Sequence, residues 1–188
     1  MVGQRRDGVS ISLSRTHMKE RGIMMSAPMV RAILRPVSPK TKTRRLSNMW
    51  GKVKAGDRLC VRETFWECAG DLFYRATHDE NDPPWEYIEY QGSPKKWRPA
   101  LHMPRLCSRI LLECTADARP ERLQDISNED AKAEGIFQTD GGWTWDMKAE
   151  RYRNAPNAFR ALWFSINGAD SWIANPALWV LAFKRVKP

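Results

Sequence analysis

Three segments of the chain alternate hydrophobic and polar residues with the period of a β-strand. The first follows a turn expected at Gly56-Asp57, where Leu59 and Val61 alternate with their neighbours. A period of two is typical of a strand that is buried on one face. The pattern predicts strands at residues 58–65, 109–116 and 179–186.

Other segments carry the start and stop residues of helices. Pro28 suits the first turn of a helix, and Pro36 marks the end of the same helix. Ser127 is a hydroxyl N-cap before two acidic residues, and Gly135 provides a stop. A longer apolar stripe at helical spacing runs up to Gly168. The predicted helices are residues 28–35, 128–134 and 156–167.

Strands dispersed among short helices, without a regular βαβ rhythm, favour a mixed α+β fold with a curled or barrel-like sheet. The 188 residues fit a single domain. Residues 1–22 are polar, basic and aperiodic, which predicts a flexible N-terminal arm before a domain at 23–188. Residues 66–105 are rich in proline and aromatic residues, and we expect them to form an insertion that contains a hairpin.

Charge is distributed unevenly along the chain. Residues 1–54 carry 13 Lys and Arg against 2 Asp and Glu, whereas residues 55–188 carry 18 against 20. The net charge of +9 therefore lies in the first third. A concentrated positive block favours partners that bear phosphate, although a solvated basic loop would have the same composition.

Several classes of protein are disfavoured. The longest apolar runs are too short to cross a bilayer, and the first residues lack the apolar stretch of a secretory signal, so the expected location is cytoplasmic, without a membrane partner. The cysteines show no CxxC pairing and the three histidines are scattered, so we expect reduced thiols, no metal and no cofactor. The cysteines are Cys60, Cys68, Cys107 and Cys114.

The densest group of basic and hydroxyl side chains is the segment from Ser38 to Arg45, which we expect to form a loop after the first predicted helix. A threonine hydroxyl becomes a nucleophile when a base takes its proton, and a lysine with a depressed pKa can serve as that base. The neighbouring cations of this segment, and partial burial in a cleft, should both lower the pKa of Lys40. The spacing of Lys40 and Thr43 allows the two side chains to meet in a tight turn. By itself such a spacing is common, and a phosphate-binding loop is the alternative interpretation.

Four separated motifs, in order along the chain, resemble ASCH-domain proteins of the PUA-like superfamily. They are Ala27-Pro28-Met29-Val30-Arg31-Ala32-Ile33-Leu34, Lys40-Thr41-Lys42-Thr43-Arg44-Arg45, Gly56-Asp57-Arg58-Leu59-Cys60-Val61-Arg62-Glu63-Thr64 and Trp179-Val180-Leu181-Ala182-Phe183-Lys184-Arg185-Val186. Two more, His102–Ile110 and Glu121–Ser127, are similar to the longer phage and prophage branch. The resemblance spans about residues 23–187 and implies a β-barrel-like fold with a cleft for a nucleobase or nucleic acid.

A small bacterial enzyme of this superfamily hydrolyses N4-acetylcytidine to cytidine and acetate with a lysine, a threonine and a glutamate. The lysine and threonine lie in a Lys-Thr-x-Thr-x-Arg motif, and Lys40 and Thr43 match it. The glutamate lies in an Ala-x-x-Glu context on a short helix, which Glu134 matches. The family usually has Gly-Arg before the lysine, whereas this chain has Ser38-Pro39.

The resemblance implies an amidohydrolase that removes an acyl group from the exocyclic N4 of a cytosine nucleoside or nucleotide. Lys40, Thr43 and Glu134 are the expected catalytic residues. The residues expected to bind substrate are Arg44, Arg45, Arg62, Glu63 and Trp66, although Arg62 and Glu63 are also suited to an ion pair across the sheet. The alternatives are a non-catalytic module for RNA or single-stranded nucleic acid, and a ribonuclease that uses the same basic cleft.

Overall fold

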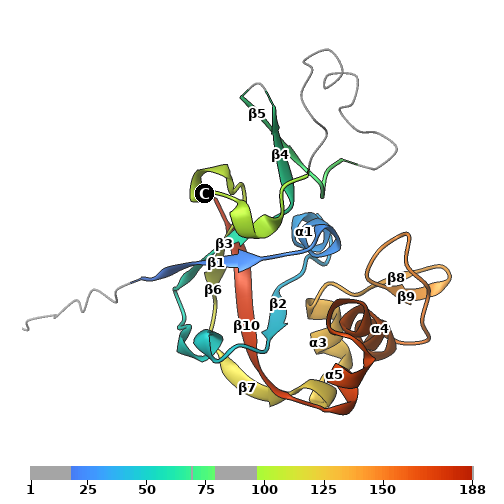
Figure 1. Ribbon diagram of the computed structural model, residues 1–188. Coiled ribbons are helices and arrows are strands. Elements are labelled where there is room, and N and C mark those ends of the chain that lie inside the picture. Colours follow the sequence, from blue (N-terminus) through green and yellow to red (C-terminus); the bar gives the residue numbers. More distant parts are fainter. Residues whose placement is uncertain (1–17, 69, 79–96, 188) are drawn as a thin grey trace, which may run out of the picture.

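The computed structural model of the protein describes residues 18–68, 70–78 and 97–187. The expectations for an arm at residues 1–17 and for the middle of the insertion, residues 79–96, lie outside the described residues. Within the described part the fold is α+β. A strongly curled half-barrel sheet is flanked by short helices (Figure 1).

The sheet is built around β10 (Ala177–Val186), the longest strand. The C-terminal half of β10 pairs antiparallel with β6 (Leu111–Cys114), and β6 pairs with β3 (Arg58–Arg62), which is parallel to β1 (Glu20–Met24). The N-terminal half of β10 pairs with β2 (Lys42–Arg45) and with β7 (Arg119–Arg122). Because β10 belongs to both halves, it joins them into one curved surface.

Helices gather at one end of this sheet. Helix α1 (Ala27–Leu34) follows β1 directly, and α3 (Asn128–Ala133), α4 (Ala155–Asn167) and α5 (Ala169–Ile173) lie together near the hairpin of β8 (Phe137–Thr139) and β9 (Gly142–Thr144) (Figure 1). The apolar faces of α1 and α4 pack into the main hydrophobic core with the inner sheet residues. This burial is the main favourable term in holding the helices against the sheet.

A second hairpin projects away from the body (Figure 1). It consists of β4 (Phe65–Cys68) and β5 (Asp71–Tyr74) and has a small apolar cluster of its own around Trp66, Phe73 and Trp97. Short 3₁₀ turns complete the connections, at Asn48–Lys52, Ala100–His102, Arg105–Cys107 and Leu123–Asp125.

The three predicted helices and the three predicted strands are present with shifts of a few residues. The capping predictions are confirmed, because the Ser127 hydroxyl accepts from the backbone N–H of Asp130 and Gly168 ends α4 with a positive φ of 81°. One expectation was wrong: residues 42–45 form β2 and are not a loop. Strand β1 begins at Glu20, within the segment expected to be an arm.

No helix in the described ranges is long and apolar enough to cross a membrane. Cys60 and Cys114 are buried and Cys107 is partly buried, and all three carry free thiols. Burial raises the pKa of the Cys114 thiol to about 11, so this group stays protonated near neutral pH.

Candidate functional site

A cavity of about 480 Å³ opens between the end of β1, helix α1, strand β2 and helix α4. Lys40, Thr43 and Glu134, the three predicted catalytic residues, all line it. Arg44 and Arg45 are also part of its wall. Most of the remaining lining is apolar and includes Met25, Met29, Phe159, Leu162 and Trp163.

Lys40 is held where three elements meet. Its backbone N–H donates to the carbonyl of Ala32 in α1 at 2.9 Å. The next residue, Thr41, donates to the carbonyl of Ala133 in α3 and accepts from the N–H of Phe183 in β10, both at 2.8 Å. These bonds fix the backbone beside the lysine against both helices and the sheet.

The ammonium group of Lys40 lies against Glu134 at the C-terminal end of α3. Its Nζ donates to Glu134 Oε2 at 2.5 Å and to the Glu134 carbonyl oxygen at 2.7 Å. Lys40 is 3% exposed and Glu134 is 4% exposed. Gly135 permits this approach, because a Cβ there would lie 2.8 Å from the Ala32 Cβ, and its φ of +103° is one that other residues rarely adopt.

Burial lowers the pKa of Lys40. Glu134 opposes this effect by stabilising the charged amine, while the guanidinium groups of Arg45 and Arg44 reinforce it. The net direction is the one that the sequence predicted from cationic neighbours and a cleft. A lowered pKa increases the fraction of lysine that is neutral, and the neutral amine can accept a proton during a reaction.

Arg44 is bound by three carboxylates. Its guanidinium donates to Glu121 Oε1 at 2.5 Å, to Asp130 Oδ2 at 3.0 Å and to Glu134 Oε1 at 3.2 Å. Lys42 forms a second ion pair with Asp130. Lys40, Lys42 and Arg44 of the basic segment are therefore paired with carboxylates of the protein, which the side chains of a solvated loop would not be.

The same pairs explain two pKa shifts. Burial lowers the pKa of Arg44, but the carboxylates of Glu134, Glu121 and Asp130 outweigh it and the net pKa is raised. Burial likewise raises the pKa of Asp130, yet its bonds with Lys42 and Arg44 bring the net pKa below the usual range. Both groups remain charged near neutral pH.

Thr43 lies in the middle of β2, opposite Leu181 of β10, and is 5% exposed. Its hydroxyl makes no hydrogen bond with any residue that the structure describes. Lys40 and Thr43 therefore share a cavity wall, without a direct hydrogen bond between them in the described part of the chain. Catalytic hydrogen bonds are often long in the absence of substrate and shorten when it binds.

Arg45 differs from Arg44 in having an unused donor. Its guanidinium donates to the Met24 carbonyl at 2.8 Å and contacts the Met25 sulfur at 3.2 Å. Its Nε is buried and has no acceptor. Burial lowers its pKa, and Glu134 opposes that shift. A buried, unsatisfied N–H on a cavity wall is a place where a substrate oxygen would be bound favourably.

The structure places the other three predicted binding residues away from this cavity. Arg62 donates to the Leu101 carbonyl at 3.4 Å, and Trp66 is buried against Phe73 with ring centroids 5.1 Å apart. The ion-pair interpretation expected Glu63 to pair with Arg62, but Glu63 pairs with a different arginine. It forms a two-pronged ion pair with Arg109, described below, because the sheet partner of β3 is β6 and the chain enters β6 through Arg109.

Sequence reasoning missed Glu121 and Asp130, the carboxylates that hold Arg44. Asp130 lies four residues before Glu134, a spacing that places two side chains on one helical face, so this residue had a usable pattern. Glu121 lies on β7, a polar strand without alternation, and no local pattern indicates it. The apolar wall from α4 was predicted only as core.

Among the described residues, no group of three or more histidine, cysteine, aspartate or glutamate side chains is placed to hold a metal ion. No protein-family model, curated protein or solved structure matches the chain.

Proposed function

We propose that this protein is an ASCH-type amidohydrolase of the PUA-like superfamily, acting on the exocyclic N4 of an acylated cytosine nucleoside. One observation carries the proposal. Lys40, buried against Glu134 with a lowered pKa, lines the same cavity as Thr43. A proton acceptor, a nucleophile and a fixed carboxylate are the groups that amide hydrolysis requires.

In the proposed reaction the neutral amine of Lys40 accepts the proton of the Thr43 hydroxyl as its oxygen attacks the acyl carbon. The C–N4 bond then breaks, and the Lys40 ammonium returns the proton to the leaving amino group of cytosine. Water, deprotonated by the same amine, attacks the threonine ester; the bond between the acyl carbon and the Thr43 oxygen breaks, the Lys40 ammonium returns the proton to that oxygen, and the carboxylic acid is released. Attack by a water that Thr43 positions is the variant without a covalent intermediate.

Glu134 acts in this scheme by orienting Lys40. Its two oxygens are already engaged, one by Lys40 and one by Arg44, so it is held in place and has no free oxygen for the leaving group. Arg45 has the unpaired Nε–H and is suited to the acyl oxygen, where negative charge develops in the transition state. The apolar wall from α4 accommodates the base and the acyl group.

The Ser38-Pro39 departure from the family pattern is compatible with the proposal. Ser38 has a φ of 49°, in the left-handed region where glycine is favoured, and glycine is the residue that the resembled enzymes carry there. Downstream of Pro39, the Lys40 backbone is still bonded to α1 and its side chain still contacts Glu134. The turn is thus made with different residues.

The purified protein should convert N4-acetylcytidine to cytidine and acetate, and chromatography can measure this conversion. It should leave single-stranded RNA intact. Lys40→Ala, Thr43→Ala and Glu134→Ala should each abolish turnover about as completely as the triple variant, because such groups act as a unit. Near-normal turnover by Thr43→Ala would remove threonine from the mechanism. Cleavage of the RNA would support the ribonuclease alternative instead.

A further inference from the structure

The cavity that Lys40 and Thr43 line has charged groups from only some of its elements. They come from residues 40–45 and from Glu134 at the end of α3. Buried apolar side chains from the start of α1 and from one face of α4 form what we call the apolar wall. It consists of Met25, Met29, Phe159, Leu162 and Trp163. The two kinds of lining suit different parts of one substrate.

The apolar wall offers a substrate no free hydrogen-bond donor. Trp163 carries the only side-chain N–H in this wall, and that N–H already donates to the Ser171 hydroxyl at 2.8 Å. Asn167, which lines the cavity beyond the wall, donates to the Trp163 carbonyl at 3.4 Å. A polar group placed against the wall would lose its hydrogen bonds with water without a replacement, which costs free energy. A hydrocarbon group would gain by the same transfer.

The apolar lining continues from the wall to the molecular surface. Met24, Leu46 and Ile166 also line the cavity and are 51%, 45% and 59% exposed. Met24 and Leu46 are held near each other, because Arg45 donates to the Met24 carbonyl at 2.8 Å. We call these three exposed residues the apolar rim. A hydrocarbon chain that starts at the reacting carbonyl can follow the wall to the rim and be shielded from water along its length.

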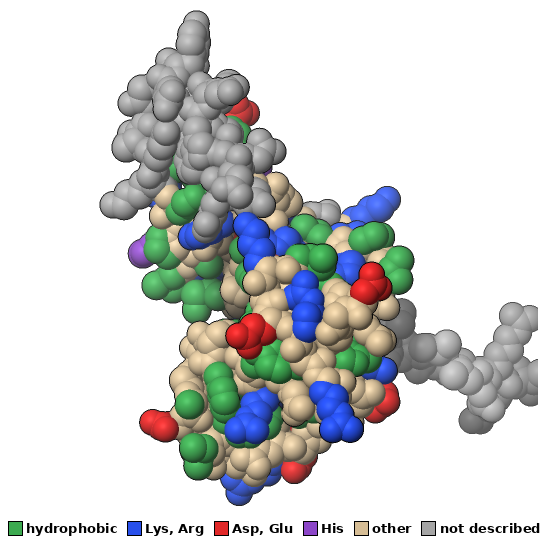
Figure 2. Space-filling model, turned by 90° about the vertical axis from the view of Figure 1, so that its right-hand side faces the viewer, with side chains coloured by type: hydrophobic (Ala, Val, Ile, Leu, Met, Phe, Trp, Pro, Cys, Tyr) green, Lys and Arg blue, Asp and Glu red, His purple; other side chains and the backbone are tan. Residues whose placement is uncertain are grey.

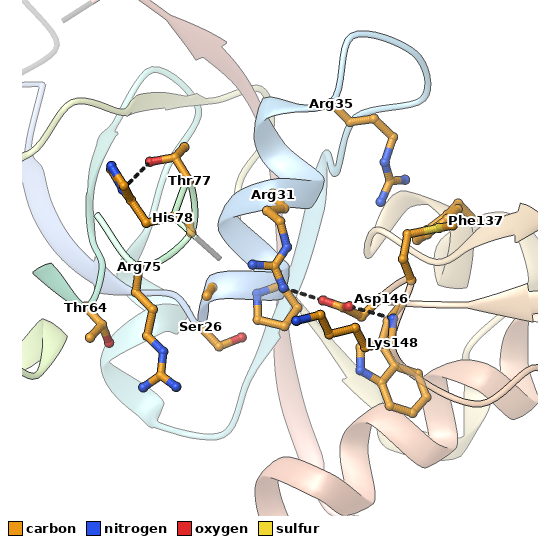
Figure 3. A pocket seen from close by; sticks show the side chains of 15 residues that line it. Ser26, Arg31, Arg35, Thr64, Arg75, Thr77, His78, Phe137, Asp146 and Lys148 are labelled. Carbon is orange, nitrogen blue, oxygen red and sulfur yellow. Dashed lines mark hydrogen bonds and ion pairs between the residues drawn. The ribbon is translucent and has the colours of Figure 1, made fainter. Parts of the chain in front are cut away.

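A different side of the cavity is polar. Ser26 and Thr64 line both this cavity and a larger cleft of about 960 Å³, which is bounded by α1 and by the segments that follow β5 and β9. Figure 3 shows both side chains among those that line the cleft, and Figure 2 shows the surface hollowed between the hairpin end and the helical end of the molecule. Hydroxyl groups donate and accept hydrogen bonds, so this junction suits the hydroxyls of a sugar.

We propose that the enzyme prefers cytosine nucleosides whose N4 carries a straight apolar acyl chain several carbons longer than acetyl. The preference rests on the proposed function, because Lys40 and Thr43 set the position of the acyl carbon. The chain lies against the apolar wall and ends at the apolar rim, and the sugar lies at the junction of Ser26 and Thr64. Cavities of about 300–1,000 Å³ enclose drug-sized ligands, so a cavity of about 480 Å³ has room for more than a base with an acetyl group.

The test compares the N4-acetyl, N4-butyryl and N4-hexanoyl derivatives of cytidine, after correction for their rates of hydrolysis in hydroxide. Each methylene that leaves water should raise kcat/KM about fourfold when fully buried, so the hexanoyl derivative should exceed the acetyl derivative by at least about 30-fold. The double variant Leu46→Gln/Ile166→Gln should reduce this ratio about tenfold, because it places amide groups against the chain. Both side chains are exposed, so the fold should be kept, which circular dichroism checks.

Ile173→Gln is the matched control, because Ile173 is an exposed isoleucine of α5 outside the cavity lining, and it should keep the ratio. Equal or falling kcat/KM along the series, or an unchanged ratio in the double variant, would overturn the acyl preference and leave the proposed function intact. A dimer that the double variant dissociates, detected by sedimentation, would assign the rim to contact between copies of the chain and would also overturn it.

If no derivative is hydrolysed, the proposed function fails, and binding decides whether the apolar wall and rim hold an acyl chain. Calorimetry then compares N4-acetylcytidine with N4-hexanoylcytidine. Tighter binding of the hexanoyl derivative that Leu46→Gln/Ile166→Gln weakens supports the acyl site. Equal binding of the two derivatives, or no binding of either, overturns it.

Discussion

Two buried glutamates, each bound to a cation, lie in different parts of this molecule. Glu134 is in contact with Lys40 and Arg44 beside the cavity proposed to bind substrate. Glu63 follows β3, is 1% exposed, and forms a two-pronged pair with Arg109 at 2.9 and 3.0 Å. Arg109 is itself stacked over Tyr74 at 4.0 Å. By burial and charge the two sites resemble each other.

Their difference lies in which cation can lose its proton. A guanidinium stays charged at any pH that a protein experiences, so the Glu63–Arg109 pair can only hold its elements together. A buried lysine can become neutral, and burial lowers the pKa of Lys40. A buried ion pair therefore indicates chemistry when its cation is a lysine beside a cavity and a hydroxyl, and structure when it is a stacked arginine.

The largest expected effect is a difference in activity between variants of Glu134 and variants of Glu63. Glu134→Gln should lower kcat/KM for N4-acetylcytidine by at least ~100-fold, within the range usual for losing a group that supports proton transfer. Glu63→Gln should keep activity within about threefold per folded molecule, because Glu63 does not line the cavity. Steady-state kinetics on both variants, after folding is checked by circular dichroism, tests this. Equal losses would show that the two pairs are not functionally distinct.

For the free energy of unfolding, the Glu63–Arg109 pair should matter more than the Lys40–Glu134 pair. Arg109→Ala leaves Glu63 buried without its cation, which should cost toward the lower end of the about 3–5 kcal/mol seen for broken buried pairs, because Arg109 is partly exposed. Lys40→Met should cost much less, since Arg44 still neutralises Glu134. Urea unfolding of the two variants measures the difference. A larger loss for Lys40→Met would assign the structural role to the Lys40–Glu134 pair instead.

The pH dependence of activity sharpens the role of Glu134. In the proposed mechanism activity requires neutral Lys40, so kcat/KM should rise with pH along a limb below the usual lysine pKa of 10.5, because burial lowers the pKa of this group. The Glu134 carboxylate stabilises the ammonium, so Glu134→Gln should move the limb to lower pH. An activated N4-acyl substrate makes the residual rate measurable. A profile flat from about pH 6 to pH 10 would favour Lys40 as a permanent cation.

The smallest expected effect is on the stability of the protein at low pH. The pKa of Asp130 is lowered on folding from its usual 3.8, so its stabilising contribution is present above pH 3.8 and is lost as pH falls through the folded value. Asp130→Asn should therefore reduce the loss of stability in acid, by under about 1 kcal/mol because the carboxylate is partly hydrated. Melting temperatures from pH 5 to pH 2 test this. An unchanged slope would assign the acid sensitivity to other carboxylates.

The parts predicted well from sequence are those with local determinants. Helices α3 and α4 have their caps at Ser127 and Gly168, and β10 has an alternating pattern. Strand β2 was missed because its four residues are all polar or charged, and its burial depends on carboxylates from β7 and α3 that are distant in sequence. Local patterns do not report such long-range compensation.

The candidate site also has parts that the sequence predicted and parts that it did not. The meeting of Lys40 with Glu134, 94 residues apart, was expected only through the family resemblance, since no spacing rule links them. Glu63 and Trp66 were misplaced because β3 ends at Arg62 and the chain turns there into the projecting hairpin. Where a strand ends depends on its partners in the sheet, and the local sequence did not show that β3 stops at Arg62.

Gly135 constrains how this protein can change over generations. A methyl group at this position would press on Ala32 and come within 3.4 Å of the Lys40 Cβ. We therefore expect few replacements of Gly135 to leave Lys40 against Glu134. If the proposed function is right, new acyl specificities would arise more readily on the α4 side of the pocket, where the side chain of Ile166 is 59% exposed.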